Sequence, residues 1–203
     1  MKEKNEIILP VYYFPNLWWW HAYLRAEVVY FNVNEKYIKQ SFRNRTCIKN
    51  PQGRLDLSIP VAYYPQNALL KDIQTANFDW KEHHYKSIYH NYRKSAFFEF
   101  YQDEVKAFFE QCNSNFIWEI ALNSIEWLLQ KIKISHRHTL IEKLPDYEIP
   151  VLEQMPNQQK NVQVLPYYQL FGDFVHNLSG LDALFCTGKG YFETDLVIKH
   201  NIW

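Results

Sequence analysis

The stretch EIILPVYYFPNLWWWHAYLRAEVVYFN, residues 6–32, decides the fold class. Residues 6–13 and 27–32 are rich in β-branched and aromatic side chains, and both predict strands. Between them, residues 17–26 predict a short helix, and Asn16 is a residue type that favours a helix start. A strand, a helix and a strand within so short a length predict a parallel crossover unit.

The rest of the chain continues this α/β pattern. Alternation of apolar and polar residues predicts further strands, at residues 54–61, 71–74 and 133–141. Helical spacing predicts helices at residues 79–95, 96–111, 116–132 and 177–185. Residues 143–165 contain three prolines and no clear period, so they are expected to form a long surface excursion. We therefore expect a single α/β domain over residues 1–203, with a mainly parallel sheet, flanking helices and a helical middle third.

The middle helices are expected to pack through their apolar sides. The side chains expected to be buried are Trp80, Ile88, Phe97, Phe108, Ile120 and Trp127. The three consecutive tryptophans at 18–20 cover all sides of one helical turn, so at least one ring is expected at the surface or in a cleft.

Composition excludes several classes of function. The 203 residues contain 22 Lys plus Arg and 22 Asp plus Glu, so no overall field favours general nucleic-acid binding. There is no signal sequence and no apolar run of about 18 residues, so no membrane span and a cytoplasmic location are expected. Cys47, Cys112 and Cys186 are widely spaced without a CxxC pair, which argues against a disulfide framework or a structural zinc site. No metal and no cofactor are predicted.

Cations gather in the segment KYIKQSFRNR, residues 36–45, although the chain as a whole is neutral. If the segment is extended, one face carries Lys39, Ser41, Arg43 and Arg45; if it is helical, Lys39 and Arg43 still align. Such a face, together with Asn44, is expected to bind the phosphate of a sugar nucleotide or of an aminoacyl donor. The alternative is a solvated edge whose charges prevent sheet pairing.

Two histidines are candidates for acid–base chemistry. His84 lies on the semi-buried face of its helix, where an imidazole can titrate near neutrality and move a proton. The alternative for His84 is a core histidine hydrogen-bonded to backbone. His21 follows the three tryptophans and is a second candidate, placed to face the strand ends. His136 and His138 share a strand face but have no third metal ligand nearby.

Two further places are candidate binding sites. Ligands of open α/β sheets lie beyond the carboxyl ends of the strands, which predicts a site that gathers Tyr13, Asn32 and the cationic segment. The turn containing Gly188 and Lys189 offers backbone groups to an anion, although it lacks the spacing of a phosphate-binding loop. The turn is therefore expected to be a helix C-cap with a local ligand contact rather than an ATP site.

Several motifs resemble the WbqC-like family, in that family's order. They are PVYYFPNLWWWHAYLRAEVVYF, YIKQSFRNRTCI, LSIPV, W-x3-H-x3-I with YRKSAFF, an LN pair in the third long helix, and NLSGLDALFCTGKG. The resemblance implies a role in bacterial surface-polysaccharide assembly of the O-antigen type. The sequence departs from the common pattern at Leu9, where many members have Gln, and at Asn32, where Asp is usual. The missing carboxylate puts a metal or general-base role at Asn32 in doubt.

Two functions follow as expectations. The first is a transferase that moves a glycyl, aminoacyl or acyl group onto a nucleotide-linked amino sugar, as the resemblance implies. The second is a non-catalytic protein that binds a sugar nucleotide or bridges assembly enzymes. A cleft that joins His84 to Arg43 would favour the enzyme.

Overall fold

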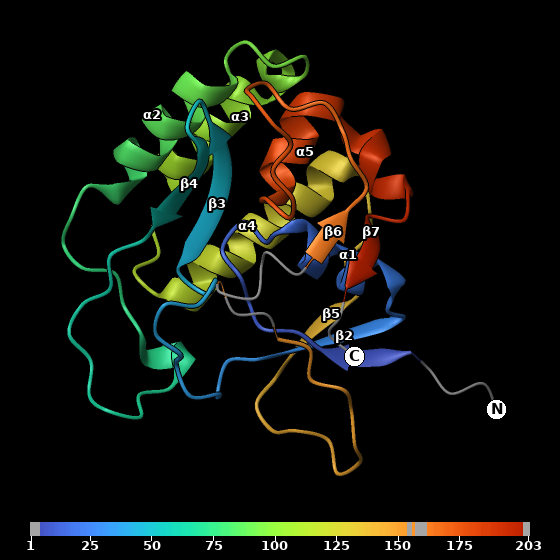
Figure 1. Ribbon diagram of the computed structural model, residues 1–203. Coiled ribbons are helices and arrows are strands. Elements are labelled where there is room, and N and C mark those ends of the chain that lie inside the picture. The colour runs from blue at the N-terminus through green and yellow to red at the C-terminus, as the bar shows by residue number, and fades with distance from the viewer. Residues whose placement is uncertain (1–4, 154–155, 157–161, 201–203) are drawn as a thin grey trace.

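A small parallel sheet organises the fold in the computed structural model, which describes residues 5–153, 156 and 162–200 (Figure 1). Its strands are β1 (Glu6–Ile8), β2 (Val28–Asn32) and β5 (His138–Ile141), in the order β1-β2-β5. Both pairings are parallel. The predicted α/β fold with a parallel sheet and flanking helices is confirmed, although the first strand is shorter than residues 6–13.

The crossover between β1 and β2 is helix α1 (Leu17–Arg25). Asn16 begins it, because its Oδ1 accepts a hydrogen bond from the Trp19 N–H at 3.0 Å. The Trp19 ring packs against Phe31 of β2, with ring centroids 6.0 Å apart. The expectation that one tryptophan ring is exposed is wrong: all three are buried. The C-terminal part of the chain covers the other side of α1, where Trp20 contacts Phe192.

A separate antiparallel hairpin follows the crossover unit. It consists of β3 (Arg45–Asn50) and β4 (Gly53–Ser58), joined by the turn between Asn50 and Gly53. Residues 37–44, by contrast, form neither a strand nor a helix but a run of turns and irregular backbone. The predicted common face for the cations of this segment is therefore wrong. The predicted strand at 71–74 is also wrong, since η1 (Leu70–Asp72) is a single turn of 3-10 helix.

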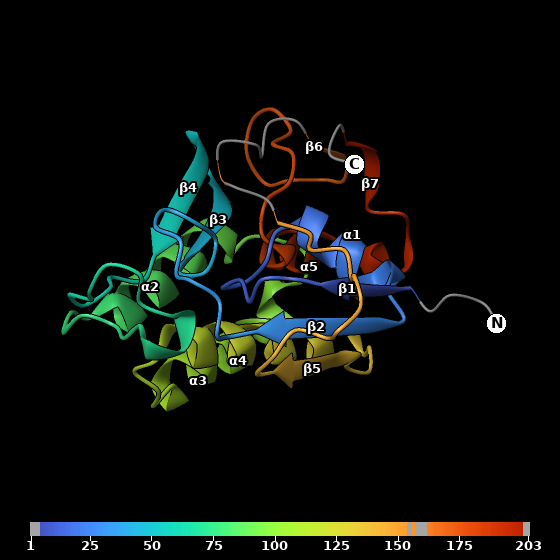
Figure 2. The same ribbon diagram turned by 90° about the horizontal axis from the view of Figure 1, so that it is seen from below.

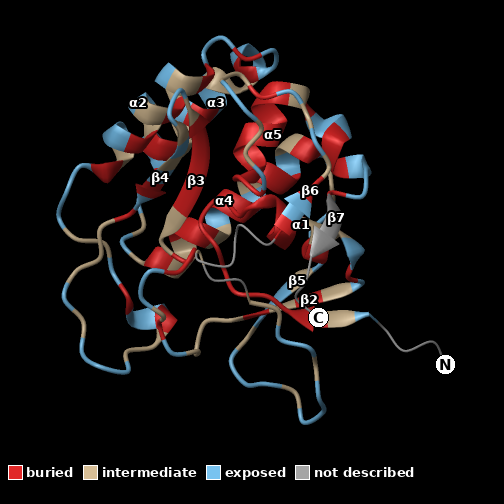
Figure 3. Ribbon diagram, in the orientation of Figure 1, coloured by how far each residue is buried: buried red, intermediate tan, exposed pale blue. Residues whose placement is uncertain are grey.

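The helical middle third is confirmed. It consists of α2 (Trp80–Tyr92), α3 (Phe98–Gln111) and α4 (Ile117–Ile132). In Figure 3 the buried positions of these helices face the interior of the molecule. Of the six side chains predicted for this core, Trp80, Ile88 and Ile120 are buried, and Phe108 and Trp127 are partly buried and pack against it.

Phe97 is the exception among the predicted core residues, with 37% of its surface exposed. It is the N-cap of α3 and not part of the helix, so it does not share the apolar face of α3. No helix within the described residues is long and apolar enough to cross a membrane.

The C-terminal part of the chain lies first beside the sheet and then against α1 (Figure 2). Within the predicted excursion, Val151 forms a parallel bridge with Ile8 on the free edge of β1. Sequence patterns missed β6 (Val162–Val164) and β7 (Val197–His200), which pair antiparallel. Between them lie α5 (Gly180–Thr187), with Ser179 as its N-cap, and η3 (Lys189–Glu193).

Candidate functional site: a carboxylate–arginine cluster at the sheet edge

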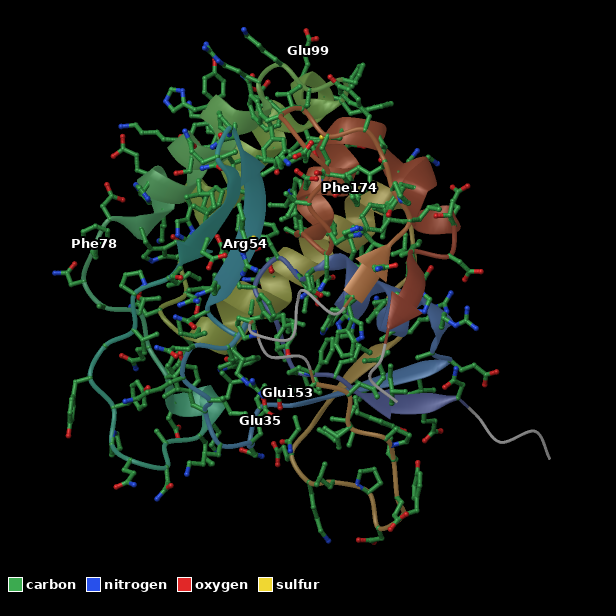
Figure 4. The ribbon with its side chains drawn as sticks, viewed as in Figure 1. Glu35, Arg54, Phe78, Glu99, Glu153 and Phe174 are labelled. Atoms are coloured by element: carbon green, nitrogen blue, oxygen red, sulfur yellow. The ribbon has the colours of Figure 1, made fainter. Side chains whose placement is uncertain are left out.

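Two glutamates lie just beyond the carboxyl ends of the parallel strands. Glu35 lies three residues after the end of β2. Glu153 lies two residues after Val151, which forms the bridge with Ile8. Figure 4 shows both labelled side chains close together at this edge of the sheet. This is the edge at which open α/β sheets bind ligands.

Arg43 joins the two glutamates. Its Nε donates to Glu35 Oε1 at 2.8 Å, and its Nη2 lies 2.7 Å from the same oxygen. Its Nη1 donates to Glu153 Oε1 at 2.6 Å. The Arg43 side chain is 0% exposed, whereas the side chains of Glu35 and Glu153 are 25% and 27% exposed. A buried guanidinium therefore holds two carboxylates that remain open to solvent. We call Glu35, Arg43 and Glu153 the carboxylate–arginine cluster.

The electrostatics of the carboxylate–arginine cluster set Glu35 apart. The pKa of the Glu35 carboxyl is raised, and burial is the largest cause. The negative charge of Glu153 also raises this pKa, whereas the positive charge of Arg43 lowers it. Burial alone would lower the pKa of Arg43, but the two carboxylates outweigh burial and raise it. Within the described residues, no donor hydrogen-bonds the second oxygen, Oε2, of either glutamate. Two carboxylate oxygens are thus available to a cationic or hydrogen-bond-donating ligand.

The other residues of the predicted cationic segment make local contacts. Lys39 is exposed, with its Nζ 5.4 Å from the centroid of the Tyr64 ring. The remaining three hydrogen-bond nearby groups: Ser41 Oγ donates to Ile38 O, Asn44 Nδ2 to Ile59 O and Arg45 Nε to Ser58 Oγ. The segment is therefore a set of separate contacts around Arg43 and not one charged surface.

His84 and Tyr13, both predicted site residues, are brought together in the core. The Tyr13 hydroxyl and His84 Nδ1 are 3.0 Å apart, and His84 Nε2 is 3.3 Å from Ser58 O. The carbonyl can only accept, so Nε2 carries the proton and Nδ1 accepts from Tyr13. His84 is 1% exposed, and burial, the largest cause, lowers its pKa to about 4. This geometry matches the alternative of a hydrogen-bonded core histidine.

His84 makes the stability of the fold sensitive to acid. The unfolded side chain takes up a proton near its ordinary pKa of 6.5, whereas the folded one resists protonation until about pH 4. The stabilisation is therefore fully present above pH 6.5, and about 3 kcal/mol of it is lost as the pH falls toward 4.

Urea unfolding at pH 7 and pH 4.5 measures this loss. His84→Gln should show a smaller loss than the parent, and His90→Gln, at an exposed position on the same helix, should lose as much as the parent. Equal losses in the parent and His84→Gln would contradict this assignment.

Gly188 and Lys189 lie away from the carboxylate–arginine cluster, in the turn after α5. Gly188 has φ 76° and ψ −172°, a conformation essentially restricted to glycine. A Cβ there would also approach the Phe97 ring to 3.0 Å. Gly188 therefore has a clear structural role as the cap of α5, and Lys189 begins the following 3-10 turn.

The remaining candidates also lie in well-defined positions. Asn32 Oδ1 accepts the Asn34 N–H at 3.0 Å, which closes the turn after β2. His21 is half-buried on α1. His138 contacts the Tyr23 hydroxyl at 3.0 Å, and its ring centroid is 5.5 Å from that of His136. No group of three potential metal ligands occurs in the part of the chain that the structure describes.

Neither Glu35 nor Glu153 was among the residues predicted for the site. A signal was present for Glu35, because it lies at the carboxyl end of a predicted strand and beside a segment rich in cations. Glu153 lies in a stretch without periodicity, and only the three-dimensional fold brings it to Arg43.

Comparison with known proteins places these features in one family. A model described as the WbqC-like protein family matches residues 11–160, well over half of the chain. The matched region includes the whole carboxylate–arginine cluster as well as Tyr13 and His84. No curated protein and no solved structure matches the chain.

Proposed function

Since the chain belongs to the WbqC-like protein family, we propose that it is a transferase that moves an aminoacyl or acyl group onto the amine of an amino sugar. Membership of the family suggests involvement in polysaccharide-related biosynthesis. The amine acceptor is the more specific part of the proposal. The observation that carries it is the pair of carboxylates, with side chains 25% and 27% exposed, held by buried Arg43 beyond the strand ends.

The carboxylate–arginine cluster suits an amine better than it suits a phosphate. An ammonium group has three N–H donors, and the Oε2 atoms of Glu35 and Glu153, to which no donor of the described residues hydrogen-bonds, provide two acceptors for them. The guanidinium of Arg43 is already engaged by both carboxylates, so it has little capacity left for a phosphate. In this proposal the phosphates of a nucleotide-linked acceptor would contact exposed Lys39, which precedes Arg43 in the same segment.

Glu35 is the proton acceptor in the proposed reaction. The bound ammonium first gives a proton to Glu35, because only the neutral amine has a lone pair that can attack. The amine nitrogen then attacks the acyl carbonyl, a C–N bond forms, the bond from the carbonyl carbon to the donor's leaving group breaks, and the second proton of the nitrogen leaves with that group or to water. A carboxyl with a raised pKa is a better base for this proton than an ordinary glutamate. Glu153 and Arg43 orient the amine and Glu35. Glu35 takes the role that was predicted for His84, whose two ring nitrogens are already hydrogen-bonded.

A comparison of two sugar nucleotides tests the amine site. One carries a free amine on the sugar, and the other carries the same sugar with the amine acetylated. We expect the free amine to bind about 10- to 150-fold more tightly, the value of one charge-assisted hydrogen bond of about 1.5–3 kcal/mol. Titration calorimetry measures both affinities.

Variants of the protein make this comparison specific. Glu153→Gln should reduce the preference for the free amine, and Glu99→Gln, on the exposed start of α3, should leave it unchanged. Equal affinities of the parent protein for the two sugars would refute the amine site.

A further inference from the structure

A pocket of about 500 Å³ lies where α3 begins, α4 ends and the turn after α5 passes between them. Aromatic rings and lysines line it together: Phe97, Phe100, Tyr101, Lys131, Lys133 and Lys189. In Figure 4, Glu99, the neighbour of Phe100 in sequence, is at the far end of the molecule from Glu35 and Glu153. The pocket is therefore separate from the carboxylate–arginine cluster.

The aromatic part of this pocket is held in place on one side and open on the other. Phe97 packs against Gly188, so closely that a Cβ on Gly188 would meet its ring at 3.0 Å. Phe100 is 71% exposed, and its ring centroid is 6.3 Å from that of Phe97. Exposed aromatic surface is costly in water and gains by stacking on a flat ligand. Phe100 thus offers a face for a planar ring.

The polar part of the pocket is cationic. Three lysines and one glutamate, Glu104, give its lining a net charge of +2 in a chain that is neutral overall. Glu104 pairs with Lys131. Within the described residues, no carboxylate lies within 4 Å of the Nζ of Lys133 or Lys189. The ammonium groups of Lys133 and Lys189 are therefore available to an anion in the pocket.

We propose that this pocket binds a nucleoside phosphate. A nucleoside phosphate carries a planar base and a phosphate on one molecule, and these two parts match the exposed Phe100 ring and the cations Lys133 and Lys189. Stacking of a base on an aromatic side chain does not depend on which base it is. The proposal therefore specifies a nucleoside phosphate as a class and not a particular base. It stands independently of the amine acceptor site, since neither site shares a residue with the other.

The test measures binding of four probes to the whole protein by titration calorimetry: uridine 5′-diphosphate, adenosine 5′-diphosphate, uridine and inorganic pyrophosphate. Both diphosphates should bind, and uridine and pyrophosphate should bind at least about tenfold more weakly, because each has only half of the matching chemistry. Lys133→Gln and Lys189→Gln should each weaken diphosphate binding about tenfold. Phe100→Ala should weaken it to a similar degree and bring it close to the affinity for pyrophosphate.

Lys106→Gln is the matched control, because Lys106 is an exposed lysine on the same helix as Phe100 and pairs with Glu110 outside the pocket. It should bind the diphosphates as the parent does. All four variants change surface side chains, so their thermal unfolding should match that of the parent. The proposal is overturned if the parent binds neither diphosphate, if pyrophosphate binds as tightly as the diphosphates, or if Lys133→Gln and Lys189→Gln weaken binding no more than Lys106→Gln.

Discussion

Glu35→Gln is expected to lower the turnover of acyl transfer to an amino sugar about 10²–10⁴-fold, the usual contribution of a positioned general base. The variant keeps the shape of the side chain and an amide oxygen that can still accept from Arg43 Nε. It removes only the capacity to take a proton from the attacking nitrogen. The fold should remain intact, because Glu153 still balances the buried charge of Arg43.

Two comparisons show whether the loss comes from proton transfer. Glu99→Gln changes an exposed glutamate at the opposite end of the molecule and should retain the turnover of the parent. Glu153→Gln removes an orienting carboxylate and should raise KM more than it lowers turnover. If Glu35→Gln turned over substrate as fast as Glu99→Gln, Glu35 would have no part in the chemistry.

Arg43→Met is expected to destabilise the fold by about 3–5 kcal/mol, the cost of removing one partner from a buried ion pair. The variant keeps an apolar chain of similar length but leaves Glu35 and Glu153 close together without their shared cation. The loss should shrink at acid pH, because burial raises the pKa of the Glu35 carboxyl and its protonation removes the repulsion from Glu153. Urea unfolding at pH 7 and pH 4.5 measures both effects.

Arg45→Met is the control for this variant. Arg45 is partly exposed, and its Nη1 lies 3.7 Å from Asp56 Oδ2, so its loss should cost about 0–1 kcal/mol. A cost below 1 kcal/mol for Arg43→Met as well would show that the cluster does not stabilise the fold.

Local sequence patterns predicted the helices and strands that form mainly because of residues within their own segment. The crossover unit and the middle helices form because each has its own apolar periodicity, and α1 and α2 also have side-chain caps at Asn16 and Asp79. The strands β3, β6 and β7 were missed because short strands derive their stability from pairing with partners, and those partners are known only from the fold.

The candidate site was predictable only in its position. The rule for strand ends directed attention to the region after β2, where Asn32 and Glu35 lie. Arg43 was recognised as unusual in a neutral chain, but a charge pattern does not show whether a cation meets a ligand or a carboxylate of its own chain. That depends on Glu153, 110 residues away in sequence. His84 illustrates the same limit, because its helical spacing showed burial but not its bond to Tyr13.

Product formation by the parent protein tests the central claim most directly. The protein is incubated with aminoacyl and acyl donors, each paired with a nucleotide-linked amino sugar and with its N-acetylated counterpart, and products are identified by mass spectrometry. The account predicts an amide product from at least one donor, with the free amine only, and its loss in Glu35→Gln. Absence of product from every pair, in a protein that still binds the sugar nucleotide, would contradict the transferase and leave the non-catalytic binding protein as the function.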